Sequence, residues 1–410
     1  MALVAKRYSL REVVSWCLFD FANSSYSAVI ASAIFPVFYV SYVVEGPTGL
    51  GDLWWGRAIS ISVFLVVISS PFMGYLADKK LNRRSLLASY TLICIAAVSL
   101  LSTLEKGEIL KGFLLILIAN TMMEGGLVFY NSFIPHIVPR DYYGRISAWG
   151  FALGYIGSAL SLILALPLVS REKFEVIWIL VAFFYGIFSL PCLIFMPKES
   201  IKTVSDPSQN KFFHDLFTSF LLIFKDKQTR RFLLSYFFYE DAVNTVIIFA
   251  SIYASSTLGF AYKELIVLYL VVQTTAFIGS IVISKPLDQL GPKVFILGNL
   301  IAWTLVTTCS AFVSHKNHFW ILASFAGLCL GAIQAASRAM YVSFIPERRE
   351  GEYFGVYSMV GKSSAILGPI LFGEVSFLFG SQRPAVFAVT FLFLMGLVFL
   401  LGVKPVSKKF

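Results

Sequence analysis

The stretch SWCLFDFANSSYSAVIASAIFPVFY, residues 15–39, carries one charged side chain, Asp20, in a run long enough to cross a bilayer. About 20 apolar residues span the hydrocarbon core. The whole chain has this character, since 58% of its 410 residues are hydrophobic and 14% are charged. A soluble domain has about 25% charged residues. Too few charges remain to cover a soluble surface, so the composition predicts a polytopic membrane protein.

Long apolar runs separated by charged or Gly/Pro breaks predict twelve spanning segments. Only helices and closed barrels satisfy their backbone within lipid. Continuous runs of this length favour helices, because barrel strands are shorter and alternate polar with apolar residues. The first segment follows a basic stretch without a cleavage signal, so we expect it to be retained as a helix. The predicted spans of this all-α fold are 13–44, 53–77, 85–103, 112–138, 146–170, 174–196, 231–258, 263–287, 294–313, 319–345, 353–379 and 384–403.

The distribution of Lys and Arg predicts the orientation of the chain. With both termini in the cytoplasm, the predicted cytoplasmic side holds 23 of these residues and the opposite side holds 8. Cytoplasmic loops of membrane proteins carry an excess of positive charge, which favours this orientation. The net charge of +10 is therefore a consequence of topology, and it predicts no binding of nucleic acid.

The longest predicted loop, residues 197–230, is a cytoplasmic linker between two halves, 1–196 and 231–410. Its first part is polar. Its second part has one apolar helical face and predicts an amphipathic helix in the membrane interface, for which a linker role is favoured over a regulatory one. The apolar face comprises Phe212, Phe213, Leu216, Phe217, Phe220, Leu221 and Phe224.

The two halves repeat one another in sequence. The string SFIP at residues 132–135 recurs at residues 343–346, and the motif Asp20–Asn23 finds its counterpart at Asp241–Asn244. Several matches in the same order, at nearly one spacing, indicate duplication of a six-helix unit. Both halves start from the same side of the membrane. Parallel repeats of this kind are typical of transporters, with the substrate path between the halves.

A motif follows the second predicted helix. The segment GYLADKKLNRRSLL, residues 74–87, resembles the loop signature between helices 2 and 3 of the major facilitator superfamily. Asn82 stands where glycine is usual, and Asn also tolerates a left-handed backbone. The resemblance implies a latch at the cytoplasmic ends of helices; a solvated basic loop is the alternative. The residues implied in the latch are Asp78, Arg83, Arg84 and, in the second copy, Asp288.

The first helix resembles a narrower group. Its string DFANSSY, residues 20–26, is similar to the signature of the superfamily branch named after the autophagy-related vacuolar amino-acid effluxers, and YEDAVNT at residues 239–245 fits the same branch. The resemblance covers nearly the whole chain. It implies twelve helices in two pseudo-repeats and the export of a small polar solute such as an amino acid. The short chain resembles prokaryotic members, which implies a prokaryotic plasma membrane.

Polar residues cluster on predicted helices 1, 4, 7 and 10, which line the central cavity in the major facilitator family. A charged side chain at mid-bilayer costs on the order of 2.5–3.5 kcal/mol on insertion scales, so each one needs a reason. Within each of these helices, the polar residues are three or four positions apart, which places them on one helical face. The candidates for substrate binding or coupling are Asp20, Asn23, Asn120, Glu124, Asp241, Asn244, Gln334, Arg338 and, on helix 11, Lys362.

Two interpretations of these residues remain open. Either the acids and bases pair to stabilise the bundle, or one carboxylate carries a coupling proton while acids and bases hold a zwitterion. In the second interpretation Glu124 carries the proton, because mid-depth leaves it least hydrated. Asp20 and Asp241, each with an Asn one turn on, then hold a substrate amine. Glu240 points about 100° away from Asp241, toward the helix end or a neighbouring helix.

Glycines predict close contacts in two helices. Gly150, Gly154 and Gly157 form a small-residue stripe on helix 5, and Gly368-Pro369 interrupts helix 11. Small residues let helix backbones approach closely in membranes, and proline breaks the hydrogen-bond ladder. We expect close packing or a bend at these positions.

Other functional classes have less support. The sequence contains no phosphate-binding loop of the G-x4-GK(S/T) type, which excludes an ATP-driven pump. It also contains no acid-rich metal-binding loop of the kind expected in a membrane enzyme, so no enzyme is predicted. An integral-membrane lipid-processing enzyme and a transport-inactive receptor or scaffold are the alternatives. The five cysteines are scattered without a CxxC pair, and no metal or cofactor is expected. The expected partners are a small-molecule substrate, a proton and the lipid bilayer, with the chain acting as a monomer.

Overall fold

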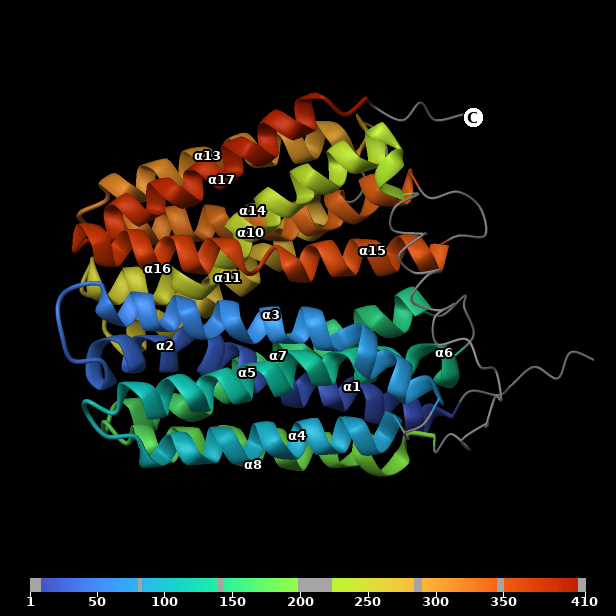
Figure 1. Cartoon of the computed structure of the whole chain (residues 1–410). Coiled ribbons are helices and arrows are strands. Elements are labelled where there is room, and N and C mark those ends of the chain that lie inside the picture. Colours follow the sequence, from blue (N-terminus) through green and yellow to red (C-terminus); the bar gives the residue numbers. More distant parts are fainter. Residues whose placement is uncertain are drawn as a thin grey trace, which may run out of the picture. The chain divides into compact units, whose positions relative to one another are not determined.

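The computed structural model describes residues 9–79, 83–138, 143–197, 223–283, 290–344 and 350–404. Within these ranges, twelve helices are long and apolar enough to cross a membrane (Figure 1). This confirms the predicted all-α polytopic fold. The predicted amphipathic helix lies outside the described residues except for its last two positions.

The described chain divides into two compact units. Unit 1 comprises Met1–Glu45 and Ile61–Val204, and unit 2 comprises Gly46–Ser60 and Ser205–Phe410. The second division falls inside the predicted linker, whereas the short segment Gly46–Ser60 groups with the second half. The domain limits 1–196, 197–230 and 231–410 stay predictions.

In unit 1, α1 packs against α7 and α8, and α4 packs against α5 and α8 (Figure 1). The helix α3 begins in unit 2 and continues into unit 1. The elements are α1 (Leu10–Ser25), η1 (Tyr26–Ala33), α2 (Phe35–Phe38), η2 (Tyr39–Val43), α3 (Leu50–Lys79), α4 (Arg83–Leu100), η3 (Leu101–Thr103), α5 (Ile109–Asn131), α6 (Ile134–Ile137), α7 (Tyr143–Val169) and α8 (Phe174–Phe195).

In unit 2, α10 packs against α17, and α14 packs against α11 and α13. The helix α10 also contacts α11, α14, α15 and α16. The elements are α10 (Lys227–Ser256), α11 (Tyr262–Val282), α13 (Pro292–Phe312), α14 (Lys316–Val342), α15 (Glu350–Ser363), α16 (Leu367–Phe379) and α17 (Gln382–Leu401).

The first span is not a uniform α-helix, because η1 and η2 are π-helical. Pro36 lacks an N–H group, and its ring clashes with the carbonyl four residues earlier. Just before Pro36, the backbone hydrogen bonds change from the α-helical to the π-helical pattern. There the Ile34 N–H donates to the carbonyl of Val29, five residues back, at 3.2 Å. Short π-helical segments inside α-helices frequently occur at functional sites.

The eleventh span is broken between α15 and α16, as Gly368-Pro369 predicts. The Ala365 N–H donates to the carbonyl of Lys362, only three residues back, at 3.2 Å. The α-helical hydrogen-bond pattern of α15 therefore ends at this point. A new helix then starts at Leu367. The break leaves backbone N–H groups at the start of α16 that need partners from elsewhere.

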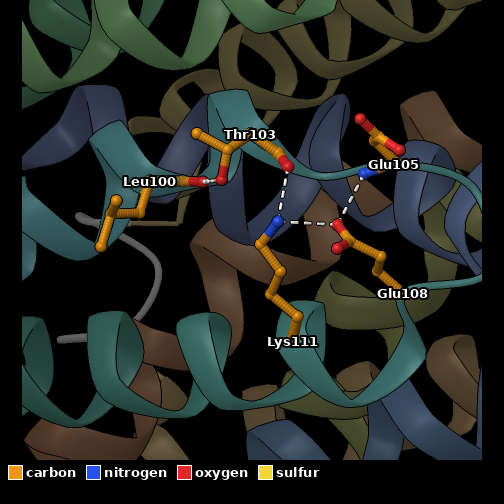
Figure 2. Close-up of polar contacts among 5 residues, drawn as sticks. All are labelled: Leu100, Thr103, Glu105, Glu108 and Lys111. Carbon is orange, nitrogen blue, oxygen red and sulfur yellow. Dashed lines mark hydrogen bonds and ion pairs between the residues drawn. The ribbon is translucent and has the colours of Figure 1, made fainter.

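The connection between η3 and α5 is held by a small polar network (Figure 2). Lys111 donates from Nζ to the carbonyl of Thr103 at 2.6 Å and to Oε2 of Glu108 at 2.8 Å. The backbone N–H of Glu105 donates to the same carboxylate at 2.9 Å. The hydrogen bonds from Lys111 and from Glu105 hold the pKa of Glu108 below its usual range. These bonds fix a short turn outside the spanning segments.

Candidate transport site

Asp20 is half-buried on α1, next to the glycine stripe of α7. Asn23, one turn on, donates from Nδ2 to Asp20 Oδ1 at 3.4 Å. A Cβ atom added at Gly150 would lie 2.4 Å from Asp20 Oδ2. One added at Gly154 would lie 2.7 Å from Ser24 Oγ. The predicted close packing is present, and the glycines leave the space that the polar side chains of α1 occupy.

Trp16 and Tyr130 join α1 to α5 close to Asp20. Trp16 donates from Nε1 to the backbone carbonyl of Tyr130, and the Tyr130 hydroxyl donates to the backbone carbonyl of Trp16, each at 3.1 Å. Their rings stack with centroids 4.5 Å apart and planes 8° apart. The two residues are 114 positions apart, so no local spacing in the sequence could reveal the pair. The contact holds the segment that carries Asp20 in a fixed position.

Asn120 is buried in unit 1 and satisfied by neighbouring side chains. It donates from Nδ2 to Ser62 Oγ at 2.6 Å and accepts from the Tyr26 hydroxyl at 3.5 Å. Its exposed fraction is 5%. Glu124, one turn further along α5, is half-buried. These hydrogen bonds tie Asn120 to its neighbours in unit 1, and Glu124 is the more accessible of the two.

Asp241 caps the broken eleventh span. Its Oδ1 accepts a hydrogen bond from the Gly368 N–H at 2.8 Å, and the residue has an exposed fraction of 0%. The backbone donor belongs to the first turn of α16, where N–H groups lack helical partners and negative charge is favoured. A Cβ at Gly368 would lie 1.9 Å from Thr245 Oγ1 and 2.8 Å from Asp241 Oδ1. Glycine at this position allows the close contact.

The other predicted residues of unit 2 differ in hydrogen bonding and in exposure. Gln334 donates from Nε2 to Glu240 Oε1 at 3.0 Å, so Glu240 does reach a neighbouring helix. Arg338 and Gln334 are exposed, whereas Asn244 and Lys362 are half-buried. In the described part of unit 2, neither Glu240 nor Asp241 forms an ion pair, so pairing with a base does not explain these two acids.

A second polar cluster lies in unit 2, on the predicted outer side; from the sequence, only its member Glu374 is singled out, with a structural role predicted. Asp52, 2% exposed, accepts hydrogen bonds from Ser376 and from Gln382. Arg57 donates to Glu374 Oε1 from Nε at 2.9 Å and from Nη2 at 2.7 Å. The sequence did offer a signal for this cluster, because Asp52 and Arg57 are charged residues within an apolar span. The same kind of signal identified Asp20 as a candidate.

The latch residues that the structure describes bind helix ends in unit 1. Arg83 donates to the carbonyl of Ser132 at 3.5 Å and contacts the ring of His136. Arg84 donates to the carbonyl of Ile194 at the end of α8 at 2.7 Å. Cations at a helix C-terminus interact favourably with its exposed carbonyls. The Asp78 side chain and Asp288 lie outside the described part, so the latch role stays a prediction.

Comparison with solved structures gives the fold of the protein. The fold matches the crystal structure of the nucleoside transporter NupG (D323A mutant) with a TM-score of 0.73, at 16% sequence identity over 96% of this chain and 99% of that one. This likeness covers nearly the whole chain and shows its fold.

Comparison of the sequence gives the class and the family of the chain. It belongs to the family described as vacuole effluxer Atg22 like, whose profile matches residues 57–144 and 139–409. It is 29% identical to an uncharacterized MFS-type transporter, YxiO, of Bacillus subtilis (strain 168), over 96% of this chain and 95% of that protein. It is 24% identical to autophagy-related protein 22 of Kluyveromyces lactis, over 62% of this chain and 55% of that protein. The family confirms the predicted transporter class and speaks against an enzyme.

Proposed function

We propose that this protein is a proton-coupled secondary transporter of a small zwitterionic solute, with amino acids as the substrate class. The observation that carries the proposal is the setting of Asp20. Its carboxylate keeps partial exposure within a spanning helix, and the glycine at position 150 keeps its space free. An intramembrane acid of this kind is costly and is retained for a function.

The substrate amine is assigned to Asp20, with Asn23 orienting the carboxylate through its amide. Asp241 is assigned to the scaffold, because its carboxylate is buried and bonded to the backbone of α16.

Alternating access between the two membrane faces is the proposed cycle. The charge distribution favours cytoplasmic termini. The match to YxiO over nearly the whole chain supports a bacterial plasma membrane as the location. Export is the proposed direction, by analogy with the effluxers for which the family is described.

A thermal-shift screen of the purified protein tests the substrate class. Amino acids, sugars, nucleosides and short peptides are compared, because a ligand stabilises the state that it binds, by about 2.7 kcal/mol at 100 times its dissociation constant. We expect stabilisation by one or a few amino acids. Stabilisation by a sugar or a nucleoside alone would show that the substrate class is wrong.

Proteoliposomes then test the coupling with the amino acid found. A pH gradient is expected to drive its accumulation in the wild type but not in Asp20→Asn. The control is Glu45→Gln, which removes an exposed acid of unit 1 that pairs with Lys106. Accumulation that ignores the pH gradient would refute proton coupling.

A further inference from the structure

Two adjacent acids on α10 each have a carboxylate oxygen without a hydrogen-bond partner in the described part of the chain. These atoms are Oε2 of Glu240 and Oδ2 of Asp241, and both are buried. Burying an ionised carboxylate without a counter-charge is strongly unfavourable, and the group takes up a proton instead. Each orphan oxygen is therefore a place where a proton can sit.

The two acids differ in access. Asp241 is 0% exposed, and its other oxygen is committed to the Gly368 N–H. Glu240 is 8% exposed, and its other oxygen accepts from Gln334, whose side chain is itself exposed. The hydrogen-bonded amide links Glu240 to the surface of unit 2. Of these two acids, Glu240 is therefore the one that is both buried enough to hold a proton and near enough to the surface of unit 2 to exchange it.

The groups around Glu240 are mostly uncharged hydrogen-bonding side chains. On α10 itself, the Tyr236 ring stacks on Tyr357 of α15 with centroids 4.3 Å apart. The Tyr239 hydroxyl and Ser337 Oγ of α14 lie 2.7 Å apart and share a hydrogen bond. Phenol and hydroxyl groups accommodate a neutral carboxyl without supplying the positive charge that would ionise it.

Charged groups on the helices packed against α10 are few. Arg338 on α14 acts electrostatically on Tyr357 and forms no ion pair with Glu240 within the described residues. Glu264 is paired with Lys316, and Glu374 with Arg57. The charged residues of these helices, beside Asp241, are Arg338 and Lys316 on α14, Lys362, Glu350 and Glu352 on α15, Lys263 and Glu264 on α11, Glu374 on α16 and Arg383 on α17.

We propose that Glu240 is a proton-binding site, with the proton on Oε2, and that it is the coupling group of the second repeat. The coupling role rests on the proposed function, whereas the proton site does not. A proton from water binds the carboxylate to give a neutral carboxyl group, and it returns to water when Arg338 approaches and supplies the counter-charge. Arg338 is exposed and lies one helical turn from Gln334. This assignment puts Glu240 ahead of Glu124 as the proton carrier.

Infrared spectroscopy of the purified full chain across a pH series tests the site without any substrate. A protonated carboxyl group has a carbonyl stretch that a carboxylate lacks. We expect the wild type to show this band at neutral pH and to lose it at alkaline pH. Glu240→Gln should lack the titrating band, and the matched control Glu264→Gln, which removes an acid paired with Lys316, should keep it.

A second variant keeps the test decisive if Glu240→Gln does not fold. Gln334→Leu removes the donor that favours the ionised carboxylate, so the band should persist to higher pH than in the wild type. A titrating band that survives Glu240→Gln would overturn the proposal. So would a band that vanishes in Asp241→Asn or in Glu124→Gln while Glu240→Gln retains it.

Transport separates this inference from the proposed function. With a substrate in hand, Glu240→Gln should exchange labelled substrate across proteoliposomes but fail to accumulate it against a gradient. If no amino acid is transported and the infrared band still depends on Glu240, the proposed function fails and the proton site stands. If pH-driven accumulation persists in Glu240→Gln, the coupling role fails and the proposed function stands.

Discussion

The two repeats place matching aspartates in different settings. Asp20 keeps partial exposure beside the unbroken helix α7, whereas Asp241 is fully buried and caps the break between α15 and α16. The glycine at position 157 is followed by serine, and its counterpart Gly368 is followed by Pro369. One proline therefore accounts for the break, because it interrupts the ladder and exposes backbone donors that an acid can satisfy. A duplicated motif preserves the acid, but the partner helix determines what the acid does.

The irregular helix also differs between the repeats. In unit 1 the first helix is interrupted by the π-helical segments η1 and η2, and its partner α7 is continuous. In unit 2 the first helix α10 is continuous over 30 residues, and its partner is broken. Each repeat thus pairs one regular helix with one interrupted helix, in opposite order.

The largest expected effect comes from filling the glycine contact of unit 2. Gly368→Ala would place Cβ within 1.9 Å of the buried Thr245 Oγ1, and overpacking of this kind costs about 1–3 kcal/mol. The Cβ of Gly150→Ala would meet the end of the half-buried Asp20 side chain, which can turn away, and would lie 2.8 Å from Cζ3 of the buried Trp16 ring. This variant should also lose stability, but less than Gly368→Ala, because its contact with a fixed group is the longer one. Melting temperatures in detergent measure both.

Gly298→Ala is the control for this pair, because nothing lies within 4 Å of its added Cβ. Alanine in place of glycine inside a helix should stabilise it slightly there. Equal losses in Gly368→Ala and Gly150→Ala would contradict the difference between the two contacts.

A smaller effect is expected at the first helix of each repeat. Asp226 caps α10 by accepting from the Thr229 N–H at 2.7 Å, whereas the side chain of Ser9 makes no capping bond to α1. Asp226→Ala should therefore cost about 0.5–1 kcal/mol, and Ser9→Ala should be neutral. Chemical unfolding of both variants measures the difference.

The pH dependence sharpens this prediction. Burial opposes ionisation of Asp226, but the hydrogen bonds from Thr229 and Gln228 outweigh it and lower the pKa of the carboxyl group. The stabilisation is therefore fully present above the unfolded pKa of about 3.9 and is lost as the pH falls through the lower folded value. The stability difference between wild type and Asp226→Ala should shrink at acidic pH. A difference that grows on acidification would contradict the capping role.

The smallest effect on stability is expected from the ion pair that joins α3 to α16 in unit 2. Arg57 and Glu374 form an ion pair with side chains that are 44% and 36% exposed, so solvent screening limits its contribution to about 0.2–1 kcal/mol. A double-mutant cycle with Arg57→Ala and Glu374→Ala should show coupling in this range. Additive losses would mean that the pair does not hold this part of unit 2 together.

Much of the fold follows from one-dimensional patterns. Hydropathy predicted the twelve spans because lipid requires long apolar helices. Helical spacing placed Asp20 with Asn23, and Gly368-Pro369 predicted close packing or a bend at the place where the structure has a break. Each of these signals is local in sequence.

The pairings between distant residues could not be predicted. Asp52 and Gln382 are 330 positions apart, and hydropathy reports the composition of a segment without naming its neighbour. The same limit applies to the partner of Glu240. Helical geometry indicated that this side chain leaves the Asp241 stripe, but only the packing of α14 against α10 shows that it meets Gln334.

The contrast between a substrate acid and a scaffold acid is tested most directly by parallel thermal-shift measurements on Asp20→Asn and Asp241→Asn, with and without the amino acid that stabilises the wild type. We predict that Asp20→Asn melts like the wild type without ligand and loses the ligand-induced shift. Asp241→Asn should melt at a lower temperature without ligand and keep the shift. A retained ligand shift in Asp20→Asn, or its loss in Asp241→Asn alone, would contradict the account.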